Sequence, residues 1–72
     1  MQAHNLQKGI YRHYKGQLYE LIDVARHSET LEYLVIYKQL YGNYSLWIRP
    51  LSMFTEDVVI DGKQQKRFTL VS

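Results

Sequence analysis

The sequence predicts a small, strongly bent all-β domain, and two observations lead to this fold class. Short segments rich in tyrosine, valine and isoleucine are separated by glycine-containing turns at close intervals. The chain has 72 residues, which is room for one domain with a thin core. We therefore expect residues 1–8 to be a disordered or extended lead-in and residues 9–72 to form a single small β-barrel domain.

The first half of the chain begins with a predicted β-hairpin. Residues 10–14 are rich in aromatic side chains and are typical of a strand. Lys15 and Gly16 form a turn signal, and residues 18–25 are expected to be the second strand.

Residues 31–41 are ambiguous between helix and strand. A helix would have Ser28 as its cap and Gly42 just after its end. A strand would place Tyr33, Val35 and Tyr37 on one face and the intervening apolar residues on the other. We favour the strand, because β-branched and aromatic side chains lose rotamer freedom in a helix.

The next predicted turn and strand lead to a proline. Gly42-Asn43 is expected to form a hairpin turn, and residues 45–49 the returning strand. Pro50 is expected to end the pairing of that strand because it lacks an N–H. Residues 50–54 are expected to form one short helical turn, with the proline at its start.

The C-terminal part of the chain predicts two more strands. Residues 58–60 and 67–71 have strand character, and Asp61-Gly62 is a strong turn signal. With the earlier segments, these make a five- or six-stranded, strongly bent SH3-like barrel the best prediction.

Charge and composition argue against several classes of protein. Nine basic and seven acidic side chains give a net charge of +2, whereas a strong nucleic-acid binder of this size carries a denser basic stripe. The absence of cysteine excludes a disulfide framework and any cysteine-based zinc site. The longest apolar run, residues 33–37, is far shorter than the roughly 20 residues of a membrane span. The first residues lack the apolar stretch of a signal peptide, so we expect a cytoplasmic protein without membrane contact.

Several motifs in a fixed order resemble a known family. They are YRHYKG at 11–16, ARHSET at 25–30, VIYKQLYG at 35–42, LWIRP at 46–50, MF at 53–54 and DGKQQKRF at 61–68. Over roughly residues 9–70 the chain resembles the bacterial family of small proteins catalogued as domain of unknown function 1653. One departure is Lys66, where we expect the family to have a proline. The resemblance implies a compact, mostly β, bacterial cytosolic domain, and it brings no established activity, cofactor or catalytic residue.

The stretch ARHSET has residue types found in active sites. A serine nucleophile needs a base within hydrogen-bond reach and an acid to orient that base. In an extended chain, however, Ser28 faces away from His27 and Glu29. His13, His27 and Glu29 together make a conceivable metal set, although their spacing matches no standard signature. We therefore expect no catalytic residues, metal or cofactor, and keep a small metal-dependent or hydrolytic enzyme using these three residues as an alternative.

A second interpretation of this stretch is a polar lock. A guanidinium and a carboxylate can form two parallel hydrogen bonds, which would tie a loop to a barrel with a thin core. The hydroxyl groups of Ser28 and Thr30 can in addition close a turn by bonding nearby backbone. The side chains available for the ion pairs are Arg12, Arg26, Glu29, Arg49 and Arg67.

The third interpretation is a recognition surface. The chain has seven tyrosines and one tryptophan, and Trp, Tyr and Arg dominate interface hot spots. Alternation puts Trp47 and Arg49 on one face of their strand, with Leu46 and Ile48 on the other. The candidate surface residues are Arg12, His13, Arg26, His27, Glu29, Tyr37, Trp47 and Arg49.

We predict from this surface a non-enzymatic binding module for a peptide or protein partner. An acidic or polar peptide fits the modest net charge best. Nucleic-acid or nucleotide binding is an alternative, since aromatic and cationic side chains can stack bases and hold phosphates. A homodimer through an exposed strand edge is a further possibility.

Overall fold

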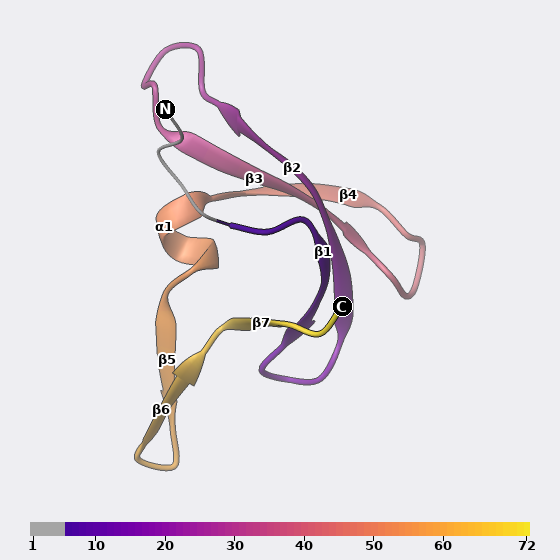
Figure 1. Ribbon diagram of the computed structural model, residues 1–72, viewed down its shortest axis with the longest axis vertical. Helices are drawn as coiled ribbons and strands as arrows, with labels where there is room; N and C mark the ends of the chain where they lie inside the picture. The colour runs from indigo at the N-terminus through magenta and orange to yellow at the C-terminus, as the bar shows by residue number, and fades with distance from the viewer. Residues whose placement is uncertain (1–5) are drawn as a thin grey trace.

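In the computed structural model, residues 6–72 are described, and they fold into seven strands and one short helix (Figure 1). The elements are β1 (Gly9–His13), β2 (Leu18–Arg26), β3 (Tyr33–Gln39), β4 (Leu46–Pro50), α1 (Leu51–Phe54), β5 (Asp57–Ile60), β6 (Lys63–Lys66) and β7 (Phe68–Leu70). Five strands form an antiparallel sheet in the order β4-β3-β2-β1-β7, and β5 pairs with β6 as a separate hairpin. No helix within residues 6–72 has the length and apolar character needed to cross a membrane.

The all-β class is confirmed, and so are the strand interpretation of β3 and the helical turn after Pro50. The five-stranded sheet is bent but open, because its edge strands β4 and β7 do not pair with each other. The strand count exceeds the expected five or six because the polar segment β6 also forms a strand. It has no apolar signal, but the turn at Asp61-Gly62, with positive φ at both residues, folds it back onto β5.

The core lies on one face of the five-stranded sheet. Tyr11, Leu21, Val35 and Tyr37 alternate along β1, β2 and β3 with side chains that face the other way. Phe54 of α1 and Phe68 of β7 complete this buried cluster. Of the expected lead-in, residues 1–5 lie outside the described residues, and Leu6 packs against the core.

A β-bulge in β2 contributes to the bend of the sheet. The register between β2 and β3 shifts by one residue between Leu21 and Asp23. Because one strand then has an extra residue, the sheet twists and bends locally. The shift also lets both Leu21 and Val24 face the core side, while Ile22 between them is partly exposed.

Pro50 lies inside the β3–β4 ladder rather than ending it. It faces Leu34 as the last residue of β4. The N–H of Gln39 donates to the Ser45 carbonyl at 3.0 Å, and hydrogen-bonded pairs alternate with non-bonded pairs along an antiparallel ladder. Counting from that pair, Trp47 and Arg49 occupy bonded positions and Pro50 a non-bonded one. The expectation that Pro50 ends the pairing of β4 with β3 is therefore wrong. At a non-bonded position the backbone nitrogen points away from β3, so the lack of an N–H costs this ladder no hydrogen bond.

Candidate binding site

In the stretch 25–30, the first two residues end β2 and the other four lie in the turn between β2 and β3 (Figure 1). Nδ1 of His27 accepts hydrogen bonds from the N–H groups of Glu29 at 3.1 Å and Thr30 at 3.3 Å. The Thr30 hydroxyl donates to a Glu32 carboxylate oxygen at 3.2 Å, and Leu31 has a φ of 66°. The alternating faces expected for residues 27–30 are therefore wrong, because the segment is a turn whose backbone N–H groups bond to the His27 ring.

The ion pairs of the proposed lock do not form in this turn. Arg26 stacks on the ring of Tyr33, 4.5 Å from its centroid, and donates to the Tyr33 hydroxyl. Glu29 has no ion pair with any residue in 6–72. The lock is thus an arginine–tyrosine contact across neighbouring strands, and not an arginine–carboxylate pair.

The structure does not assemble the three residues of the enzyme alternative. His13 ends β1 beside the start of β2, whereas His27 and Glu29 lie beyond its other end. Nine strand residues separate the two places, which is roughly 30 Å of extended chain. Within residues 6–72, no group of three His, Asp or Glu side chains is placed to hold a metal ion. The predicted metal or hydrolytic set is therefore not formed within one molecule.

Three predicted surface residues do come together on the core side of the sheet. Trp47 lies directly opposite Tyr37, and Arg49 opposite Val35, in the β3–β4 ladder. A hollow of about 230 Å³ opens beside them at the edge of the core. We call its lining the tyrosine–arginine face, which consists of Tyr19, Tyr37, Gln39, Tyr41, Trp47 and Arg49.

Hydrogen bonds hold the rings of this face in place. The hydroxyl groups of Tyr19 and Tyr41 lie 2.6 Å apart. The indole N–H of Trp47 donates to Oγ of Ser45 at 2.9 Å, and that hydroxyl donates to Oε1 of Gln39. Burial, followed by the hydrogen bond to Tyr41, raises the pKa of Tyr19 to about 12. The tryptophan remains 52 % exposed, so an oriented aromatic surface faces solvent.

Arg49 is the unpaired charge of the face. Its Nε is buried without a hydrogen-bond partner, and no carboxylate among residues 6–72 lies within ion-pair distance of it. Burial lowers the pKa of His13, and the charges of Arg67, Lys15 and Arg49 lower it further. Arg67 is paired with Glu56 at 3.3 Å. The face is therefore cationic, and Arg49 is its charge without a counterion in the described chain.

The other predicted surface residues lie elsewhere. Arg12 alternates with His13 along β1 and so lies on the opposite face of the sheet. Arg26 lies at the far end of β2, and His27 and Glu29 lie in the β2–β3 turn that follows it. His13 adjoins the tyrosine–arginine face through Tyr19, with 6.3 Å between the ring centroids.

Sequence reasoning missed three members of the face: Tyr19, Gln39 and Tyr41. Two of them carry a weak signal, because Tyr19 is two residues from Leu21 and Gln39 two residues from Tyr37. Tyr41 lies in a turn, where no periodicity applies.

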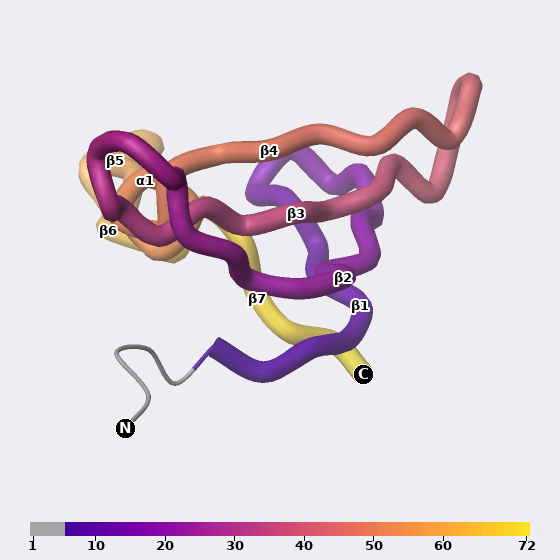
Figure 2. The backbone as a smooth tube through the Cα atoms, turned by 90° about the horizontal axis from the view of Figure 1, so that it is seen from above, coloured from indigo at the N-terminus to yellow at the C-terminus, as the bar shows by residue number. Residues whose placement is uncertain are grey.

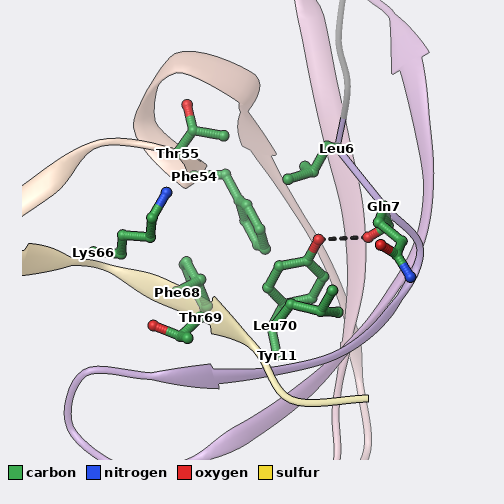
Figure 3. A pocket seen from close by; sticks show the side chains of 9 residues that line it. All are labelled: Leu6, Gln7, Tyr11, Phe54, Thr55, Lys66, Phe68, Thr69 and Leu70. Carbon is green, nitrogen blue, oxygen red and sulfur yellow. Dashed lines mark hydrogen bonds between the residues drawn. The ribbon is translucent and has the colours of Figure 1, made fainter.

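A second hollow, of about 400 Å³, is lined in part by the buried rings of Tyr11, Phe54 and Phe68 (Figure 3). The rings of Phe54 and Phe68 stack along it with their centroids 4.1 Å apart. Lys66 extends over it as its one charged lining residue. Leu6 and Gln7, which adjoin the undescribed residues, form part of the wall. The lining is a mixture of apolar and polar side chains, and it lacks the arginine beside aromatic rings that the tyrosine–arginine face has.

Comparisons with known proteins agree on one family. The family described as protein of unknown function (DUF1653) matches residues 9–70. A crystal structure of a DUF1653 protein from Bordetella bronchiseptica has a similar fold, with a TM-score of 0.85 and 36 % sequence identity. The similarity covers 93 % of this chain and 88 % of that one. No curated protein matches the sequence.

Proposed function

The chain belongs to the DUF1653 family of proteins of unknown function, and we propose that it is a non-enzymatic binding module for an acidic peptide segment of a protein partner. The tyrosine–arginine face is the binding surface. The observation that carries the proposal is Arg49, a half-buried guanidinium with no counterion among residues 6–72, beside a half-exposed tryptophan.

The charge on Arg49 supports an anionic ligand. A buried polar atom without a partner costs free energy, on the order of 1–3 kcal/mol. Nε of Arg49 is such an atom, and Nε of Arg67 is a second one. The two arginines lie near each other, since the charges of both lower the pKa of His13. A carboxylate that reached the guanidinium of Arg49 would supply a counterion, and a planar guanidinium can bind a carboxylate through two hydrogen bonds.

The aromatic side chains support a peptide as the carrier of that carboxylate. Trp47, Tyr41 and Tyr19 present ring surface together with polar tips, which suits contact with peptide backbone and side chains. Their hydrogen bonds to one another and to Ser45 are already made, so little ordering entropy remains to be lost on binding.

Nucleic acid is the weaker alternative. Affinity for a phosphate backbone grows with the number of phosphates that basic side chains neutralise. The face has one unpaired arginine, and the whole chain has a net charge of +2. A ligand that offers one or two anionic groups fits this arrangement better than a nucleic-acid backbone with many phosphates.

The proposal is tested by titration with a defined probe. The peptide acetyl-Glu-Glu-Tyr-Glu-Glu-amide supplies carboxylates around one ring, and the same peptide with glutamine in place of glutamate is the neutral control. Because the chain has a single tryptophan, its indole N–H resonance and its fluorescence report directly on Trp47. We expect the acidic peptide to shift both signals and the neutral peptide to shift them much less.

Two variants locate the binding energy. Arg49→Gln should weaken the acidic peptide roughly 10–100-fold, which corresponds to a charge-assisted hydrogen bond of about 1.5–3 kcal/mol. Arg12→Gln removes the same charge from the opposite face of the sheet and should leave the affinity nearly unchanged. Equal losses in both variants would indicate general electrostatic attraction. A response to a thymidine 12-mer that exceeds the peptide response and falls steeply with salt would favour nucleic acid instead.

A further inference from the structure

We propose that two copies of this chain pair through the free edges of β4, in antiparallel register about Ile48, to form one continuous sheet. This inference does not depend on the peptide-binding proposal. It concerns the outer edge and the solvent side of β4, and the only residues it shares with the core side of the sheet, where the peptide is assigned, are Trp47 and Arg49. The argument has three parts: the backbone of the edge, its self-complementary sequence, and its exposed apolar side chains.

The edge of β4 has backbone groups without partners in the sheet. β4 is the terminal strand, with β3 as its single neighbour, and it runs along the outer margin of the molecule (Figure 2). The bonded pair between Gln39 and Ser45 sets the alternation of the ladder. Leu46 and Ile48 therefore direct both their N–H and C=O groups away from β3, and Pro50 directs its C=O the same way.

These groups match their own copies when the strand is turned around. In an antiparallel pair centred on Ile48, the two Ile48 residues exchange both hydrogen bonds. The N–H of each Leu46 meets the Pro50 carbonyl of the other copy. The proline has no N–H to offer, so each Leu46 carbonyl stays without a strand donor, and the register forms four hydrogen bonds in all. β4 is also longer than β7, the other edge, which has three residues.

The side chains match in the same register. Trp47 of one copy lies opposite Arg49 of the other, on the same face of the joined sheet, where a guanidinium can stack on an indole ring. On the opposite face, Ile48 meets Ile48. Leu46 and Ile48 are 64 % and 63 % exposed, and with Ile36 and Trp47 they line an open apolar hollow of about 440 Å³. Pairing covers this apolar surface with the same surface of the second copy.

An exposed strand edge of this kind is a template for another strand unless something blocks it. Charged side chains, bulges and central prolines are the usual blocks. β4 has no bulge, its one charged residue, Arg49, faces a tryptophan in the proposed register, and its proline stands at the end. The shared edge is five residues long, so the dimer is a weak one whose dissociation constant is on the order of micromolar.

The experiment is sedimentation equilibrium of the full chain over a range of concentrations up to about 1 mM. We expect the mass to rise from 8.6 kDa toward twice that value. Ile48→Pro removes the central outward N–H while leaving the bonds to β3 intact, and it should keep the chain monomeric. Val59→Lys, at an equally exposed position (69 %) on β5, is the matched control and should dimerise like the parent chain.

A charge-swap pair tests the register even if the proline variant fails to fold. Ile48→Lys and Ile48→Glu each place like charges opposite one another and should each be monomeric. Mixed in equal amounts, the two variants should associate one to one, and added salt should weaken this association. A parent chain that stays at 8.6 kDa at every concentration overturns the proposal. So does a dimer that Ile48→Pro leaves unchanged, or a charge-swap mixture that remains monomeric.

Discussion

Phe54 is the side chain whose loss should most weaken this fold. It is the buried residue of the four-residue helix α1 and is 1 % exposed. Its ring stacks on Phe68 with centroids 4.1 Å apart and meets the edge of Tyr11 at 5.5 Å. The helix follows Pro50 directly and packs against β3 and β4. The ring therefore anchors the segment that joins the five-stranded sheet to the β5–β6 hairpin.

The expected cost of Phe54→Ala follows from these contacts. Truncating a buried phenylalanine costs about 3–5 kcal/mol, and the stacked partner places this site in the upper half of that range. A chain of 72 residues has a total stability of roughly 4–11 kcal/mol at 0.05–0.15 kcal/mol per residue. The substitution therefore removes a large fraction of the free energy of unfolding and leaves a marginally stable chain.

Urea unfolding followed by far-ultraviolet circular dichroism measures this loss. With a denaturant slope of about 1 kcal/mol per molar for a short chain, the midpoint should fall by about 4–5 M. Met53→Ala is the matched control, since Met53 is in the same helix but 44 % exposed, and it should cost less than about 1 kcal/mol. A midpoint shift below about 1 M for Phe54→Ala, or equal shifts for the two variants, would refute the assignment of the ring as the anchor.

Two further predictions concern a glycine and a histidine. A Cβ on Gly9 would lie 2.3 Å from the Ser72 carbonyl oxygen, at a φ of 148°, so Gly9→Ala should lower the free energy of unfolding by about 1–3 kcal/mol. Gly16→Ala, with nothing within 4 Å of the added atom, should cost less, and equal urea midpoints would contradict this reasoning. The native pKa of His13 is lowered below 6.5, first by burial, so the unfolded chain takes up the proton more readily. The contribution of neutral His13 to the free energy of unfolding should be complete above pH 6.5 and should be lost as the pH drops through the native pKa. In His13→Gln the free energy of unfolding should therefore depend less on pH between about pH 7 and pH 5.

The backbone class followed from local information in the sequence. Tyrosine-rich and β-branched segments between glycine turns predicted the strands, and Pro50 predicted the start of the helical turn. These signals are local because they depend on the φ preferences of single residues and on the period-two alternation of side chains. β6 escaped prediction for the same reason, since its sequence KQQK has polar side chains on both faces.

The candidate site was predicted only in part. Alternation correctly placed Trp47 and Arg49 on one face of their strand. Alternation could not decide whether that face lies against the core or in solvent, and in the structure the two side chains are only partly covered by the core. The pair shares its face with the buried Tyr37, but β4 is the edge strand, so Trp47 stays half exposed. Strand order, which no local pattern encodes, decides this exposure.

For this protein, the sequence by itself determined most of the strands, most of the turns between them, and the family to which the chain belongs. The tertiary structure decided which side chains meet. His13 and His27 are separated because one long strand lies between them, and Tyr19 reaches Tyr41 because β2 pairs with β3. The physical reason is that strand propensity depends on a residue and its immediate neighbours. The surroundings of a side chain depend instead on register and strand order, which the packing of the whole core determines.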